Sequence, residues 1–190
     1  MPTHALLVPT KCTRDNPPEA WLRDLVNGIG TGEHQLRVYI GIDADDTLWT
    51  NEWAESAASL LNPLDVTVDV VISPPDQPSG AVSAVWNRLA KRAVADGVDG
   101  WLVLGGDDVV YSCNEGGAWL EDAWRDNMDG REKLRLLHPM DATDPSCCTF
   151  PIVAAQHVDL LGSVVSFQMS FSTTGPTHFS GQCIGASAAS

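Results

Sequence analysis

Residues 82–108 read VSAVWNRLAKRAVADGVDGWLVLGGDD. Apolar residues recur at helical spacing over residues 82–93, and a glycine follows where helices commonly end. The apolar run at residues 101–104 predicts a buried strand, which leads into two glycines and the pair Asp107-Asp108. A helix that runs directly into a strand is part of a β-α-β unit, so this stretch favours an α/β fold.

The same alternation of strand and helix precedes this stretch. Apolar runs predict three earlier strands: His4–Val8 (ended by Pro9), Leu36–Ile42 and Val66–Ile72. Helices are expected to begin after the capping residues Asn16 and Asn51. Downstream, the pattern predicts a helix over 119–124, strands at Leu134–Leu137 and Phe150–Val153, and a short helix that ends at Gly162. The order predicts one domain with a mostly parallel, twisted, Rossmann-like sheet and helices on both faces.

The charge of the chain restricts its partners. A formal net charge of −14 over 190 residues disfavours binding to nucleic acid or to an anionic membrane. It also repels phosphate, so a diphosphate ligand would require a cation. The five cysteines do not form a disulfide or zinc pattern. We see neither a signal peptide nor a transmembrane run, which predicts a cytoplasmic protein.

Two acidic clusters each follow a predicted strand. They are Asp43-Ala-Asp-Asp46 and Asp107-Asp108. Ligands of open parallel sheets bind outside the carboxyl ends of the strands, so both clusters are expected at the ligand edge. Carboxylate oxygens suit Mg²⁺ or Mn²⁺, and such a cation would also bridge phosphate oxygens. A solvated loop with capping aspartates is the alternative interpretation of each cluster.

Several of these stretches together resemble a known family. They are LLVPTK (6–11), VYIGIDADD (38–46), VWNRLAKRA (85–93), WLVLGGDDV (101–109) and FPIV through HVDLLG (150–162). Their order and spacing are similar to family-two glycosyltransferases of the A-type fold, including short domains of large algal viruses and algae. The resemblance covers about residues 4 to 162. It implies a nucleotide-binding half at 1–110, an acceptor side at 111–162 and an atypical tail at 163–190.

The resemblance also implies a reaction and a set of site residues. A sugar would move from a nucleotide sugar, UDP-linked by analogy, to a glycan or other hydroxyl acceptor, with Mn²⁺ or Mg²⁺ as cofactor. Asp43 would accept a hydrogen bond from the base, and Asp107 and Asp108 would hold the metal, with Asp107 also near the ribose. The expected donor-binding residues are Pro9, Thr10, Arg14, Asp43, Asp45, Gly80, Asn87 and Asp107. Asn87 could equally be a helix-surface amide, and Arg14 a solvated loop charge.

The chain departs from that family at its C-terminal end. Residues 163–190 contain no Asp, Glu, Lys or Arg, so the tail offers no side-chain carboxylate as a general base. Either Asp141, Asp144 or Asp159 serves as the base, or the C-terminal part is truncated or replaced, and no catalytic residue is assigned. His178 is a candidate for a third metal ligand, with an incidental histidine in the tail as the alternative. A catalytically degenerate domain that only binds a nucleotide sugar is therefore an alternative.

A second family resemblance gives a different enzyme. DADDTLW (43–49) is similar to the nucleophile loop of haloacid-dehalogenase-type phosphatases, with Asp43 as nucleophile, Asp45 as acid/base and Asp107-Asp108 on Mg²⁺. Two features count against it. A full strand–helix unit precedes the loop, and Lys91 lies well upstream of the last acidic motif, inside the predicted helix.

Overall fold

The computed structural model describes residues 2–11, 36–46, 59, 67–72, 74, 81–107, 124–125, 136–137 and 151–164. Its strands form one six-stranded sheet in the order β3-β2-β1-β4-β6-β5. The pairs β3-β2, β2-β1 and β1-β4 are parallel, and β6 runs antiparallel to both of its neighbours, β4 and β5. The predicted α/β class with a mostly parallel sheet is therefore confirmed. The bounds of the strands are β1 His4–Thr10, β2 Leu36–Ile42, β3 Thr67–Ile72, β4 Trp101–Leu104, β5 Leu136–Leu137 and β6 Ile152–Ala154.

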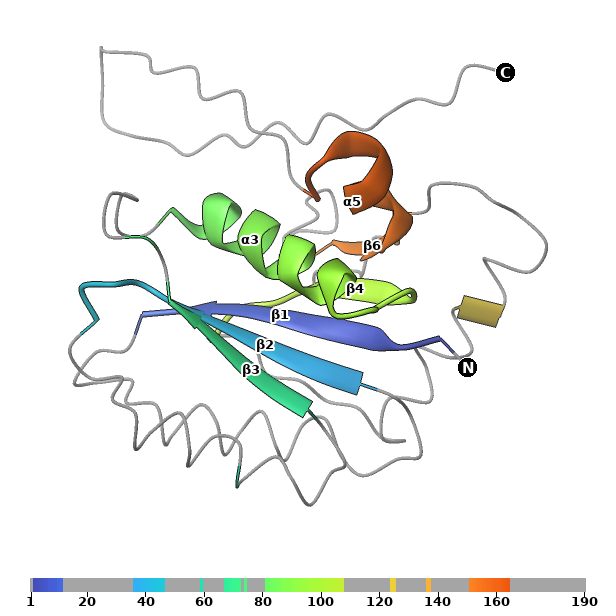
Figure 1. The fold of residues 1–190 in the computed structure, drawn as a ribbon. Helices are drawn as coiled ribbons and strands as arrows, with labels where there is room; N and C mark the ends of the chain where they lie inside the picture. The colour runs from blue at the N-terminus through green and yellow to red at the C-terminus, as the bar shows by residue number, and fades with distance from the viewer. Residues whose placement is uncertain are drawn as a thin grey trace, which may run out of the picture.

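The chain changes direction across the sheet at β1. It passes outward from β1 to β2 and then β3, and α3 (Val82–Ala95) returns it to the other side of β1, where β4 pairs. This makes the boundary between β1 and β4 a topological switch point, where ligands of open α/β sheets bind. In Figure 1 the chain enters β1 near the label N, and the carboxyl ends of the parallel strands lie at the opposite side of the sheet.

Helix α3 packs across β1 and β2, and Gly41 in β2 permits a very close approach. A Cβ atom at position 41 would lie 2.3 Å from Cγ1 of Val85 and 3.2 Å from Leu89. Val85, Leu89, Ala90 and Ala93 are the buried residues of the helix, which matches the predicted apolar stripe. The chain leaves the helix through Gly97 at a φ of 88°, a backbone conformation that glycine adopts without a steric penalty.

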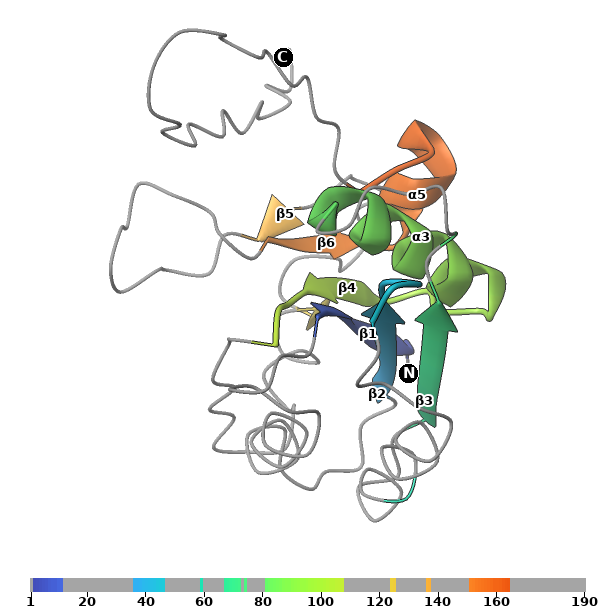
Figure 2. The same cartoon turned by 90° about the vertical axis from the view of Figure 1, so that its left-hand side faces the viewer.

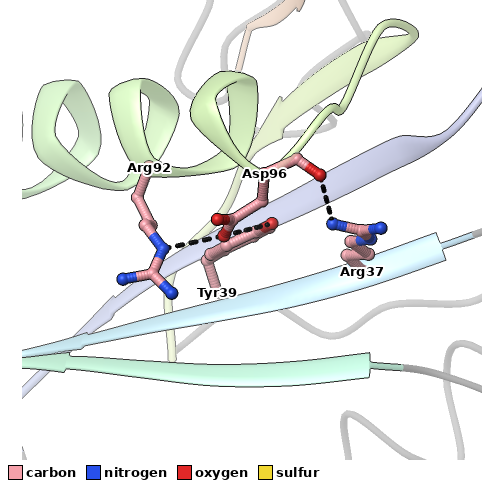
Figure 3. A network of polar contacts seen from close by, with 4 residues as sticks. All are labelled: Arg37, Tyr39, Arg92 and Asp96. Atoms are coloured by element: carbon pink, nitrogen blue, oxygen red, sulfur yellow. Dashed lines mark hydrogen bonds and ion pairs between the residues drawn. The ribbon is translucent and has the colours of Figure 1, made fainter.

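A network of polar contacts joins the C-terminal end of α3 to β2 (Figure 3). Arg92 Nε donates to Oδ2 of Asp96 at 2.8 Å, and the Tyr39 hydroxyl donates to the same oxygen at 3.2 Å. Arg37 donates to the Asp96 carbonyl oxygen at 2.7 Å, which satisfies a carbonyl that the helix leaves open. The hydrogen bond from Arg92 is the main reason that the pKa of Asp96 is lowered, whereas burial raises the pKa of Tyr39.

The second part of the sheet carries α5 (Gln156–Leu161), which ends at Gly162 with a φ of 69°. Both α3 and α5 lie on the same side of the sheet in the two views (Figures 1 and 2). The helix that the sequence predicts after Asn16 falls outside the described residues, as does the tail from residue 165. Of the helix predicted after Asn51, only Ser59 is described, and it is helical. Of the helix predicted at 119–124, only Trp124 is described, and it is helical.

His4 and Trp101 fill the core at the amino-terminal ends of β1 and β4. Both are fully buried, and the Trp101 backbone N–H donates to Nδ1 of His4 at 2.9 Å. The ring of Trp124 meets both side chains edge to face, at centroid distances of 5.9 Å from His4 and 5.1 Å from Trp101. This cluster lies at the edge opposite the switch point, so it belongs to the packing of the sheet.

Candidate functional site

A hydrogen bond spans the switch point between β1 and β4. Thr10, the last residue of β1, donates from Oγ1 to Oδ2 of Asp107 at 2.7 Å. Thr10 is 6% exposed and Asp107 is half-buried, so water reaches this bond poorly. The two residues are 97 positions apart in the sequence. The structure thus brings together two of the predicted donor-binding residues, at the edge where a ligand is expected.

Pro9 explains how the segment before Asp107 is held. The Gly105 N–H donates to the Leu7 carbonyl at 2.9 Å, so the next bond of this parallel ladder would run from residue 9 to the Gly105 carbonyl. Pro9 has no N–H to give. The indole N–H of Trp86 donates to the Gly105 oxygen instead, at 3.0 Å. Gly105 is therefore held from β1 on one side and from α3 on the other.

The first acidic cluster lies beside this site, at the end of β2. Asp43 is 8% exposed, and its carbonyl accepts from the Asp46 N–H at 3.0 Å, which closes a tight turn. Asp45 is exposed and pairs with Lys11, the residue after β1, at 3.4 Å. Arg88 of α3 interacts electrostatically with Asp43 of this cluster. Burial lowers the pKa of its guanidinium, and the negative charge of Asp43 acts in the opposite direction.

Asn87 has a structural contact. Its Oδ1 accepts from the Val164 N–H at 2.9 Å, which ties the chain after α5 to α3. This contact agrees with the interpretation of Asn87 as a helix-surface amide. The predicted contact of Asn87 with the donor stays a prediction.

Of the residues described, Asp107 is the candidate metal ligand. No group of three or more His, Cys, Asp or Glu side chains that could hold a metal occurs among the described residues. Mg²⁺ is commonly bound by only one or two carboxylates together with substrate phosphates and water, so an aspartate pair is a sufficient donor set. The predicted second ligand, Asp108, lies outside the described residues, as do Arg14, Gly80 and His178.

The candidate general bases are placed only in part. Asp159 is exposed on α5, which begins after β6 at the edge opposite Thr10 and Asp107. Asp141 and Asp144 lie outside the described residues, in the segment between β5 and β6. The start of β6 is held at the switch-point edge, because the Leu104 N–H donates to the Pro151 carbonyl at 3.1 Å.

Comparison of the chain with models of known protein families returned no match, and comparison with curated proteins returned none either. No helix in the described part of the chain combines the length and the apolar character that crossing a membrane requires. The function is therefore inferred from the geometry at the switch point.

Sequence reasoning missed two residues of this site. No role at this site was predicted for Trp86, yet its indole N–H donates to the Gly105 carbonyl. Arg88 received no role, yet its charge interacts with that of Asp43. A signal for Trp86 exists in the sequence: a proline at the end of a central strand leaves a carbonyl on the neighbouring strand in need of another donor. No comparable signal identifies Arg88, because it depends on how α3 is rotated over β2.

Proposed function

We propose that the chain binds a nucleotide sugar at the switch point between β1 and β4 and transfers the sugar to a hydroxyl acceptor, as a metal-dependent glycosyltransferase. The observation that carries the proposal is the Thr10–Asp107 hydrogen bond of 2.7 Å. It fixes a carboxylate at the carboxyl end of β4, next to two glycines that leave room for a ligand.

The order of the first four strands supports a nucleotide at this place. The arrangement β3-β2-β1-β4 is also that of the first four strands in the doubly wound dinucleotide-binding fold, which binds its ligand at the switch point. In our proposal Asp43 accepts a hydrogen bond from the base. The positive charge of Arg88 acts on Asp43, and the oxygens of a carboxyl group can accept hydrogen bonds from a base.

The net charge of −14 makes the cation necessary in this proposal. Asp107 and Asp108 would hold Mn²⁺ or Mg²⁺, which when bound neutralises the diphosphate and stabilises the nucleoside diphosphate as it leaves. Lys11 adds a positive charge at the same edge, and its pairing with Asp45 at 3.4 Å is exposed and weak enough to be exchanged for a phosphate.

Topology favours Asp141 or Asp144 over Asp159 as the general base. The segment that contains the first two re-enters the sheet at Pro151, which is bonded to Leu104 beside Gly105. Asp159 belongs to a helix that starts at the opposite edge. A base must come within hydrogen-bond reach of the acceptor hydroxyl, directly or through one water.

Calorimetric titration of UDP in the presence and absence of Mn²⁺ tests the proposal. We expect wild-type protein to bind UDP with Mn²⁺ and at least about tenfold more weakly without it, and Asp108→Ala to lose the metal-dependent part. Asp99→Asn is the matched control: it removes an acidic charge at the opposite edge and keeps an oxygen that accepts from the Thr3 N–H. Equal binding by wild type and Asp108→Ala would contradict the metal site.

A second assay separates a transferase from a binding domain. Release of UDP from UDP-sugars with Mn²⁺ should occur in wild type and fall at least about 100-fold in Asp141→Asn or Asp144→Asn, the lower range for loss of a general base. Binding without any release would favour the degenerate domain. Turnover of a generic phosphate ester that Asp43→Asn abolishes would favour the phosphatase.

A further inference from the structure

We propose that Asp45 competes with the phosphates of a nucleotide for Lys11, so that the contact between these two side chains limits how tightly the nucleotide binds. This inference rests on the proposed nucleotide site and adds to it a residue that sets the affinity. It gives Asp45 the opposite role to the one that the family resemblance implies, in which Asp45 helps to bind the donor. The competition involves only these two side chains and phosphate oxygens, whichever residues hold a cation.

Lys11 and Asp45 stand at the carboxyl ends of neighbouring parallel strands. Lys11 directly follows Thr10, the last residue of β1, which is in register with Ile42, the last residue of β2. Thr10 also donates to Asp107 across the switch point. The chain at Lys11 therefore leaves β1 at the place where ligands of open α/β sheets bind. A lysine side chain offers N–H donors and a positive charge, and both suit a phosphate.

The contact between the two side chains is one that a ligand can replace. Lys11 Nζ lies 3.4 Å from Oδ2 of Asp45, whereas strong hydrogen bonds between an ammonium group and a carboxylate measure about 2.7–2.9 Å. The two side chains are 48% and 62% exposed, so water and salt weaken their attraction. A diphosphate carries more negative charge than one carboxylate, and it would attract the ammonium group more strongly.

The two partners differ in how far they can move. Asp45 lies in a turn that the Asp46 N–H closes by donating to the Asp43 carbonyl at 3.0 Å, so its short side chain stays beside the end of β2. Lys11 carries its charge on a flexible four-carbon stem, which lets the ammonium group turn toward a phosphate. A phosphate that shared this ammonium group with Asp45 would lie next to the carboxylate, and the two negative groups repel each other. Binding of one partner therefore opposes binding of the other.

Removing the charge of Asp45 should thus tighten the binding of a nucleotide. We expect Asp45→Asn to lower the dissociation constant of UDP about two- to fivefold, which corresponds to about 0.4–1 kcal/mol, the upper part of the range for exposed ion pairs. The gain requires Lys11. In a Lys11→Met background, Asp45→Asn should keep only the smaller, general effect of removing one negative charge near the ligand.

Calorimetric titration with UDP at saturating Mn²⁺ tests the inference on wild type, the two single variants and the double variant. Lys11→Met alone should weaken UDP about tenfold, near the lower range for a hydrogen bond between charged groups. Asp45→Glu is the matched control, because it keeps the negative charge and should bind UDP within about 1.5-fold of wild type. Uridine, which has no phosphate, should bind wild type and Asp45→Asn equally.

Each other result contradicts a specific part of the inference. If Asp45→Asn weakens UDP binding, Asp45 helps to hold the ligand and does not compete with it. If the gain from Asp45→Asn is as large in the Lys11→Met background, it does not come from the release of Lys11. In both cases wild type still binds UDP, so the inference fails while the proposed function stands. If wild type does not bind UDP, both fail together. Thermal unfolding checks that each variant is folded, and Asp45→Ala must shift the affinity in the same direction as Asp45→Asn.

Discussion

The Gly105 carbonyl oxygen cannot accept a hydrogen bond from Pro9 and accepts one from Trp86. Because Pro9 cannot donate to Gly105, the oxygen accepts from the Trp86 indole at 3.0 Å, and α3 is thereby linked to the end of β4. The Gly105 carbonyl would otherwise be a buried acceptor without its ladder partner, which costs about 1–3 kcal/mol. Because Pro9 has no backbone N–H, a side chain of α3 bonds the segment that carries Asp107 instead.

This contact predicts opposite effects of one substitution in two backgrounds. Trp86→Phe should lower the free energy of unfolding by about 1–3 kcal/mol, because the Gly105 oxygen loses its donor. Pro9→Ala alone should destabilise by about 0.4–1 kcal/mol, because the unfolded chain gains freedom. In the Trp86→Phe background the same change should stabilise, since the substituted residue supplies the missing backbone N–H. Urea denaturation of the four proteins measures these values, and equal effects of Pro9→Ala in both backgrounds would contradict the exchange of donors.

The sequence predicted which single residues lie at the site, but it did not predict which of them contact one another. Asp43 and Asp107 were expected at the ligand edge because each follows an apolar run, and both lie at the ends of their strands. The bond between Thr10 and Asp107 joins residues 97 positions apart, and no local pattern encodes such a pairing. The contact of Asn87 with Val164 is equally non-local, at 77 positions.

At the scale of elements, the fit of α3 on β2 depends on the absence of one side chain. The 2.3 Å between a Cβ at position 41 and Val85 Cγ1 is far inside van der Waals contact, so any larger residue would push the helix away from the strand. Trp86 and Arg88 stand between Val85 and Leu89 in the same helix. The fit at Gly41 therefore also sets how these two residues approach Asp43 and Gly105.

Gly41→Ala should destabilise the fold by about 1–3 kcal/mol, the usual cost of overpacking a core. Val85→Ala alone should also destabilise, by about 0.5–2 kcal/mol, because it removes buried methyl groups. The double variant should be more stable than the sum of the two losses predicts, since Val85→Ala removes the atom that the new Cβ meets. Chemical denaturation of the four proteins tests this, and additive losses would show that the clash is relieved elsewhere.

Most described elements were predictable because their signals are local. Strands β2 and β4 have the predicted bounds, since each is an apolar run with turn residues after it. The prediction that β1 ends before Pro9 was wrong: the strand continues to Thr10, because the side of Pro9 that lacks a donor faces β4 at the end of their ladder. The reversed direction of β6 was not predicted. Strand direction depends on how connections cross the molecule, and residue patterns do not record it.

At the scale of the whole molecule, stability depends on pH through a group on α5 and a group at the C-terminal end of α3. Burial lowers the pKa of His157 on α5, against an opposing backbone hydrogen bond at Ala154. The pKa of Asp96 is lowered mainly by the bond from Arg92. In both cases the unfolded state binds the proton more tightly, so the free energy of unfolding falls as pH falls.

The two groups act in different pH windows. The contribution of His157 is complete above its unfolded pKa of about 6.5 and is lost as pH falls toward its lower native pKa. That of Asp96 is lost only below about pH 4. The test compares the urea midpoint at about pH 7.5 with that at about pH 5.5, two values on either side of the unfolded histidine pKa. From the higher to the lower pH, the midpoint should decrease more in wild type than in His157→Gln, which has no group that titrates at this position. The comparison with the variant removes the effect of the net charge of −14, which acid also reduces. The same decrease in both proteins would contradict this assignment.

The reversed strand β6 has an evolutionary consequence. Leu137 and Ile152 are register partners, so the chain leaves the sheet and returns to it at adjacent positions on the ligand edge. Closing a longer connection between fixed, adjacent anchors costs little: each doubling of its length adds only about 0.6 kcal/mol. The length of the connection between β5 and β6 can therefore change while the register of Leu137 with Ile152 is kept. In the proposed function, an exchange of this connection would be the least costly way for descendants of this chain to acquire a new acceptor.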